Sequence, residues 1–280
     1  MVTKYDYGKS EVEACLSVLL ELMTILGEFR DYIVLTGGWV PYFLVEERGH
    51  EHVGSLDIDI ALDFKEISDD SYQTILHALK NRGYREGEQP FIFYRTATAS
   101  DGRNVTVEVD LLAGEYGGTT RSHRTQSVQD VRARKARGCD LVFEHYRPLK
   151  ISAKMPDGAR NEVNIKIADI IPFLVMKGMA LWERYKEKDA YDIYFTLLHY
   201  PGGIDELIKI FRPFKSTKLV TEGLGKIRAK FKNIDAPGPV WLTNFEDIDE
   251  EEEKERLKRD AYERVNAFLD ALGIEEFEEE

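Results

Sequence analysis

The chain has 280 residues, of which 43% are apolar, enough for the core of one large or two smaller domains. No uninterrupted apolar stretch approaches the roughly 20 residues that cross a bilayer, and no signal peptide is visible, so we expect no membrane partner. The net charge of −13 argues against a nucleic-acid partner, but residues 246–280 hold 16 acidic and 5 basic residues, which leaves −2 elsewhere. Cys15 and Cys139 form no disulfide or metal spacing, so we expect a cytoplasmic protein.

The first part of the chain mixes helical and strand patterns. Helices are expected where apolar residues recur every three or four positions, and strands where polar and apolar residues alternate. In chain order the sequence predicts a helix at 11–29, a strand at 31–38, a short helix at 39–49, a strand at 55–64, a helix at 70–83, and strands at 91–98, 104–112, 141–152 and 161–167.

From Asp169 onward the pattern is helical throughout. Helices are predicted at 170–186, 188–200, 203–214 and 216–231 and, after a Pro/Gly-rich break at 235–241, a solvated charged helix at about 246–272. We therefore expect an α+β protein, with an α/β domain over 1–167 and a helical domain over 168–280.

Acidic residues gather on two of the predicted strands. Asp57 and Asp59 are one residue apart, so both project to the same face while the apolar residues between them point into the core. Asp110 continues this pattern on a later strand. If the two strands are neighbours, the three carboxylates meet, and three carboxylates can hold two Mg²⁺ ions for phosphoryl or nucleotidyl transfer. The alternative is a solvated sheet face, and Asp63 and Glu108 fit that description.

A glycine pair precedes this strand. Gly37 and Gly38 lie between a strand and a short helix, where glycine lets the backbone approach a phosphate. With Asp57 and Asp59 on the next strand and Asp110 on a later one, the chain resembles the nucleotidyltransferase superfamily. That resemblance implies a mixed β-sheet flanked by helices, two Mg²⁺ ions held by the three aspartates, and a glycine turn that contacts the nucleotide phosphates.

A second resemblance lies in residues 173–198, which are similar to a helical segment of AbiEii-type toxins, the nucleotidyltransferases of toxin–antitoxin systems. Those proteins carry a lysine in one helix and a basic-Asp-x-x-Asp cluster at the start of the next. Lys177, Lys188, Asp189 and Asp192 stand at the matching positions. The resemblance implies that these four residues contribute to nucleotide binding, that Lys177 reaches the triphosphate, and that Asp192 orients it or acts as a base.

Helical geometry gives this segment a second interpretation. On one helix, Lys177, Arg184, Lys188 and Asp192 would form a single polar stripe. Such a stripe either faces a polar ligand or faces solvent, and an exposed Lys188–Asp192 pair would be worth only a few tenths of a kcal/mol.

Two other polar segments are candidates for function. His50 and His52 flank Glu51, a trio that could bind a metal but is more simply a solvated loop. The basic stretch 121–138 either contacts RNA phosphates or forms an exposed helix.

Together these patterns predict a Mg²⁺-dependent nucleotidyltransferase. It would move an NMP group from a nucleoside triphosphate, such as ATP, to a hydroxyl acceptor, with Asp57, Asp59 and Asp110 at the metals. The toxin resemblance implies RNA, in particular tRNA, as the acceptor, and an antitoxin as protein partner. The Gly-Gly-Trp triplet also resembles aminoglycoside adenylyltransferases, so a small-molecule acceptor is the alternative, and a non-catalytic nucleotide- or partner-binding module is a further one.

Overall fold

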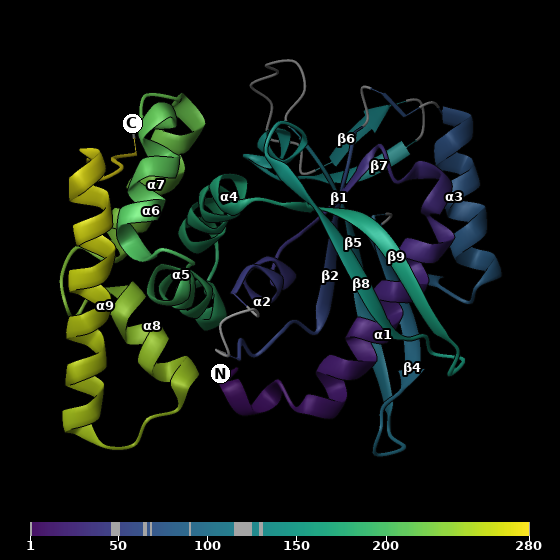
Figure 1. Ribbon diagram of the computed structural model, residues 1–280, viewed down its shortest axis with the longest axis horizontal. Helices are drawn as coiled ribbons and strands as arrows, with labels where there is room; N and C mark the ends of the chain where they lie inside the picture. Colours follow the sequence, from purple (N-terminus) through teal and green to yellow (C-terminus); the bar gives the residue numbers. More distant parts are fainter. Residues whose placement is uncertain are drawn as a thin grey trace. The chain divides into compact units, whose positions relative to one another are not determined.

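A computed structural model describes residues 2–45, 51–63, 66–67, 69–89, 91–114, 125–128 and 131–279, without the side chains of 69, 125–128 and 131–134. It shows an α+β protein with a mixed β-sheet, flanking helices and a helical C-terminal part, as the sequence predicts (Figure 1). None of the helices in these ranges is long and apolar enough to cross a membrane.

The chain divides into two compact units. The sheet unit comprises Tyr7–Val40 and Gly54–Pro172, and the helical unit comprises Met1–Asp6, Pro41–Val53 and Phe173–Glu280. The expected boundary between 167 and 168 is close to the point where the chain enters the helical unit. Two early segments nevertheless belong with the C-terminal helices, because their contacts are made with residues distant in sequence.

The sheet unit is built on one mixed sheet. Its strands are β1 (Ile33–Thr36), β2 (Asp57–Leu62), β3 (Arg85–Glu86), β4 (Ile92–Thr98), β5 (Asn104–Ala113), β6 (Thr125–Val128), β7 (Val131–Lys135), β8 (Tyr146–Lys154) and β9 (Arg160–Ala168). The spatial order is β3-β4-β5-β2-β1-β9-β8, with β7 beside β5 and β6 beside β7. Strand β2 runs parallel to β5 and antiparallel to β1. The two strands that carry the predicted aspartates are therefore neighbours.

Helix α1 (Lys9–Ile25) supplies much of the cover of this sheet. It contacts β2, β4, β5, β8 and β9, and most of its apolar side chains are buried, Leu19 and Leu22 fully. The helix ends four residues before the predicted end, because Gly27–Phe29 forms a 3-10 turn that leads into β1. The unit also contains α3 (Asp69–Asn81), and α2 (Trp39–Val45) begins in it directly after the glycine pair.

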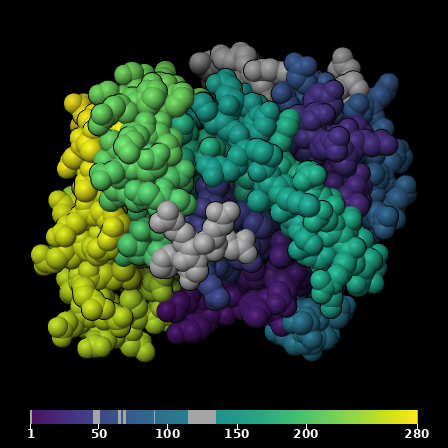
Figure 2. Space-filling model, in the orientation of Figure 1, coloured from purple at the N-terminus to yellow at the C-terminus, as the bar shows by residue number. Residues whose placement is uncertain are grey.

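The helical unit is made of successive amphipathic helices. They are α4 (Ile170–Glu183), α5 (Glu187–His199), α6 (Gly203–Phe211), α7 (Lys218–Lys230), α8 (Pro237–Glu246) and α9 (Glu251–Leu272). Helix α5 packs on α6, α8 and α9, while α9 also contacts α7 and α8. Green and yellow atoms in Figure 2 belong to these C-terminal helices. Helix α9 is charged outside, as predicted, but buries Val265, Phe268 and Leu269 on its inner side.

Three sequence predictions of local structure are wrong. Residues Cys139–Phe143 form a 3-10 helix, so β8 begins at Tyr146. The expected break at 235–241 opens helix α8, because proline at the first helical position costs no hydrogen bond. Within 121–138 the described residues form strands β6 and β7 and a following turn, and no helix, whereas residues 121–124 and 129–130 lie outside the described ranges.

Candidate functional site

Four carboxylates share one face of the sheet. In the parallel β2–β5 pair, Asp59 lies directly opposite Asp110 and Asp57 directly opposite Glu108. Residues opposite one another on adjacent strands point to the same side, so the four acids lie together on that face. The alternating residues on the other face are fully buried, namely Ile58, Ile60, Val107 and Val109. The strand neighbourhood expected from the sequence is therefore present in the backbone.

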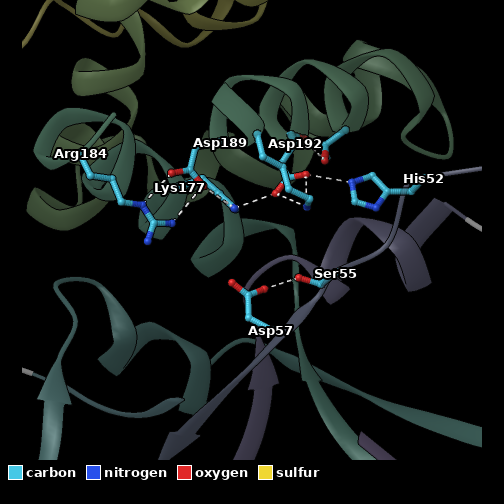
Figure 3. A network of polar contacts seen from close by, with 9 residues as sticks. His52, Ser55, Asp57, Lys177, Arg184, Asp189 and Asp192 are labelled. Atoms are coloured by element: carbon cyan, nitrogen blue, oxygen red, sulfur yellow. Dashed lines mark hydrogen bonds and ion pairs between the residues drawn. The ribbon is translucent and has the colours of Figure 1, made fainter. Parts of the chain in front are cut away.

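Asp57 is held by two contacts at the start of β2. The buried Ser55 hydroxyl donates a hydrogen bond to Asp57 Oδ1 (Figure 3). The indole N–H of Trp39, the first residue of α2, donates to the Asp57 carbonyl oxygen over 3.0 Å. Sequence reasoning missed Ser55, whose only signal is its position two residues before Asp57.

The glycine turn lies against the second aspartate. Gly37 has a φ of +70°, and a Cβ added to it would stand 1.8 Å from Asp59 Oδ2. In the antiparallel β1–β2 pair the preceding residue, Thr36, is opposite Asp59. Position 37 therefore requires glycine for two reasons: the backbone is left-handed there, and the Asp59 carboxylate approaches too closely for a side chain. Gly38 follows, buried, immediately before α2.

The acids fit Mg²⁺ in their chemistry and their strand positions, because hard carboxylate oxygens are its preferred ligands. In the described part of the chain, however, no three His, Cys, Asp or Glu side chains stand close enough together to hold a metal ion. Asp57 is hydrogen-bonded to Ser55 and Asp59 faces Gly37. The assignment of two Mg²⁺ ions stays a prediction.

Glu108, whose sequence position fits a plain surface acid, has a partner on the next strand. It lies opposite Tyr94 in the antiparallel β4–β5 pair. The charge of Glu108, and its hydrogen bond with the phenol, raise the pKa of Tyr94. Glu108 thus marks the β4 side of the acidic face.

A second polar cluster lies within the helical unit. Lys177 projects from α4, and Lys188, Asp189 and Asp192 project from α5. Lys177 Nζ is 2.7 Å from Asp189 Oδ1 and 2.7 Å from Asp192 Oδ2. Lys188 Nζ donates to both oxygens of Asp192, over 2.8 and 3.1 Å. All four side chains are buried, so the interpretation as a solvent-facing stripe is wrong.

Arg184 and His52 complete this cluster (Figure 3). Arg184 lies just beyond α4 and donates through Nε and Nη2 to the two oxygens of Asp189, over 2.9 and 3.1 Å. His52 Nε2 is 2.9 Å from Asp192 Oδ1, and its ring contacts Tyr191 and Phe195. The lysine and the later residues do not form one continuous stripe, because α4 ends at Glu183 and α5 begins at Glu187.

Burial and charge oppose each other in this cluster. Burial lowers the pKa of Lys177, but the carboxylates of Asp189 and Asp192 outweigh it and raise that pKa overall. Burial raises the pKa of Asp192, but Lys177 and Lys188 bring it well below its usual range. The pKa of Asp189 is likewise lowered, against its burial, by Lys177 and Arg184. At neutral pH Lys177 and the two aspartates are therefore charged.

His52 behaves differently. Burial lowers the pKa of His52 to about 4, with Lys188 and Lys177 adding to this effect and Asp192 opposing it. His52 is therefore neutral at pH 7, and its Nε2–H donates a hydrogen bond to the Asp192 carboxylate. The expected solvated loop is thus wrong for His52, while His50 lies outside the described residues. No local pattern could have found this contact, because its partner is 140 residues away in the sequence.

The fold and the site define an α+β protein with an acidic sheet face beside a glycine turn. No protein-family model matches the chain, and no curated protein matches it. Two solved structures from Helicobacter pylori are similar over 92% of this chain. JHP933 is 16% identical, with 93% of its chain covered and a TM-score of 0.39. A protein described as a candidate nucleotidyltransferase is 15% identical, with 96% covered and a TM-score of 0.40. Likenesses at this level establish neither a family nor an activity.

Proposed function

We propose that this protein is a nucleotidyltransferase that moves an NMP group from a nucleoside triphosphate to a hydroxyl acceptor. One arrangement carries the proposal: Asp59 and Asp110 lie opposite each other on parallel strands, with the Gly37 turn against Asp59. Paired acids beside a glycine turn combine a place for cations with a backbone that phosphates can approach.

In the proposed reaction the acceptor oxygen attacks the α-phosphorus, and the bond from that phosphorus to the pyrophosphate oxygen breaks. Asp110, which is buried, takes the proton that the hydroxyl loses. Gly37 leaves the room that the Asp59 carboxylate occupies beside the turn. Mg²⁺, held by Asp57, Asp59 and Asp110, would neutralise charge on the phosphates.

We propose that the acceptor is RNA, in particular tRNA. We also propose that the protein acts as the toxin of a toxin–antitoxin pair. Support comes from the sequence resemblance of residues 173–198 and from the nearly neutral charge of the chain before residue 246. Lys177 belongs to the helical unit, and its assignment to the triphosphate stays a prediction.

Purified protein incubated with each labelled nucleoside triphosphate and total RNA, with Mg²⁺ or a chelator, tests the activity. Asp59→Asn and Asp110→Asn should each reduce label transfer and pyrophosphate release by at least about 100-fold, because each removes charge at the reacting phosphate. Asp31→Asn is the matched control, since its side chain in the same unit is 76% exposed.

The outcomes separate the candidates. Full transfer by folded Asp59→Asn would overturn the proposed site. Transfer to an aminoglycoside panel, and none to RNA, would show a small-molecule enzyme. Nucleotide binding with no turnover under any condition would show the non-catalytic module.

A further inference from the structure

Aromatic rings and a lysine form one continuous surface group in the helical unit. The Tyr185 ring is 5.0 Å from that of Trp241, at an interplanar angle of 67°. Lys230 Nζ lies 5.0 Å from the Trp182 ring centroid and 5.6 Å from that of Trp241. We name these four residues, Trp182, Tyr185, Lys230 and Trp241, the aromatic patch. It joins the end of α4 to α7 and α8.

The patch is open to solvent at Tyr185. Tyr185 is 86% exposed, more than any other large hydrophobic residue in the described chain, and both tryptophans are only partly buried. Leaving an aromatic ring in water forgoes the free energy of burying it, about 1.5–3 kcal/mol for a large apolar side chain. An exposed tyrosine beside a tryptophan therefore points to a surface that another molecule covers.

The chemistry of the patch selects that molecule. Lys230 already occupies the cation position over the two indoles, so a cationic ligand would be repelled. A ligand with a flat π face and a negative charge would stack on the rings and pair with the lysine. Arg184, next to Tyr185, has a side chain that is 40% exposed, but its guanidinium is paired with Asp189, so Lys230 is the positive group of the patch. Nucleobases joined by phosphates have both properties.

The exposure of the patch favours a polynucleotide over a single nucleotide as its ligand. Small ligands bind in concave pockets that cover most of their surface. A ring as exposed as Tyr185 covers one face of one base and leaves the neighbouring phosphates in solvent, which suits a strand that runs across the surface. Stacking requires unpaired bases, so the strand is single rather than double.

We propose that the aromatic patch binds single-stranded RNA, with a base stacked on Tyr185 and the adjacent phosphate at Lys230. Its role in presenting an acceptor strand rests on the proposed function, whereas the binding itself can be measured without transfer. The basic stretch 121–138 contains no Phe, Tyr or Trp, whereas the aromatic patch offers three such rings.

Binding of a labelled, unstructured oligoribonucleotide of about 12 nucleotides, followed by fluorescence anisotropy, tests the patch. Tyr185→Ala should weaken binding by roughly 5- to 100-fold, the range for loss of one stacked base, while Tyr185→Phe should bind as the wild type does. Lys230→Gln should weaken binding and reduce its salt dependence by about one phosphate contact.

Two controls make the result specific. Tyr5→Ala removes another tyrosine of the helical unit that is 71% exposed and should leave the affinity unchanged. Tryptophan fluorescence should fall when the RNA binds, because two of the three tryptophans belong to the patch and the third, Trp39, is fully buried.

Failure of the patch and failure of the proposed enzyme give different results. Unchanged RNA affinity in Tyr185→Ala, with transfer intact, would overturn the patch alone. Asp59→Asn should bind RNA normally, so an absence of transfer leaves this test unaffected. Tryptophan quenching by ATP that Tyr185→Ala abolishes would indicate a mononucleotide site and overturn the assignment to RNA.

Discussion

Gly37 meets the strictest steric demand of any residue at the acidic face. Its φ is +70°, and a Cβ at this position would lie only 1.8 Å from Asp59 Oδ2, so there is no room for a side chain. Gly37→Ala should therefore displace Asp59 and reduce nucleotidyl transfer by about 100-fold, the cost of a displacement of about 1 Å at a reacting centre.

Gly27→Ala is the matched control, because a Cβ at Gly27 meets nothing within 4 Å. Both variants are compared in kcat/KM and in urea unfolding. Equal activity of the two folded variants would contradict the role of the turn.

His52 makes the stability of the folded protein depend on pH. Burial, with smaller contributions from Lys188 and Lys177, lowers its pKa from 6.5 to about 4, although Asp192 opposes this. Below about pH 6.5 the unfolded chain takes up a proton that the folded chain does not, so the free energy of unfolding falls until about pH 4. A shift of this size corresponds to about 3 kcal/mol.

His52→Gln keeps an amide donor but does not titrate. Between pH 7 and pH 4 its free energy of unfolding should fall by about 3 kcal/mol less than that of the wild type, as measured by urea unfolding. His52→Leu, which also removes the donor, should show the same shallow profile from a lower starting stability. Parallel profiles for wild type and His52→Gln would disprove this linkage.

At the scale of elements, helices α4 and α7 cross with their backbones in close contact. A Cβ on Gly178 would stand 2.0 Å from the Gly223 carbonyl oxygen, and a Cβ on Gly223 would stand 2.8 Å from that of Val175. This crossing positions α4, which carries Lys177 into the buried ion cluster.

Helix propensity and packing predict opposite signs for Gly178→Ala. Alanine favours a helix over glycine by about 1 kcal/mol, but here the helices must separate. We expect a net destabilisation of about 1–3 kcal/mol in denaturant unfolding. Gly27→Ala should change the free energy of unfolding little, because a Cβ at that position meets nothing within 4 Å. A more stable Gly178→Ala protein would contradict this prediction, because it would show that the two helices can accommodate the added methyl group.

The elements with a clear periodicity were predictable, and their partners in space were not. Alternation gave strand β5 and the shared face of Asp57 and Asp59, since side-chain direction follows from backbone geometry alone. The parallel β2–β5 pairing and the burial of Lys188 depend on tertiary contacts that a local pattern does not contain. Charged residues within an apolar segment indicated a polar site, but not whether ligand, solvent or other side chains neutralise it.

At the scale of the whole molecule, charge is distributed unevenly along the chain. Residues 246–280 contain 16 acidic and 5 basic residues, so most of the net charge of −13 lies in this segment. The end of this segment is not merely solvated, because Ile274 is buried and the Phe277 ring lies 5.3 Å from that of Trp182. The acidic segment therefore belongs to the helical unit and is not an independent tail.

The helical unit is assembled from three separate stretches of chain, and this has a consequence for synthesis. Segment 41–53 is synthesised long before α5. Another 140 residues must be added after His52 before the chain contains Asp192, the residue that accepts its hydrogen bond. The sheet unit has all its residues by Pro172. The nascent protein can thus complete its sheet first, while His52 stays without its hydrogen-bond acceptor and its aromatic neighbours until α5 has been synthesised.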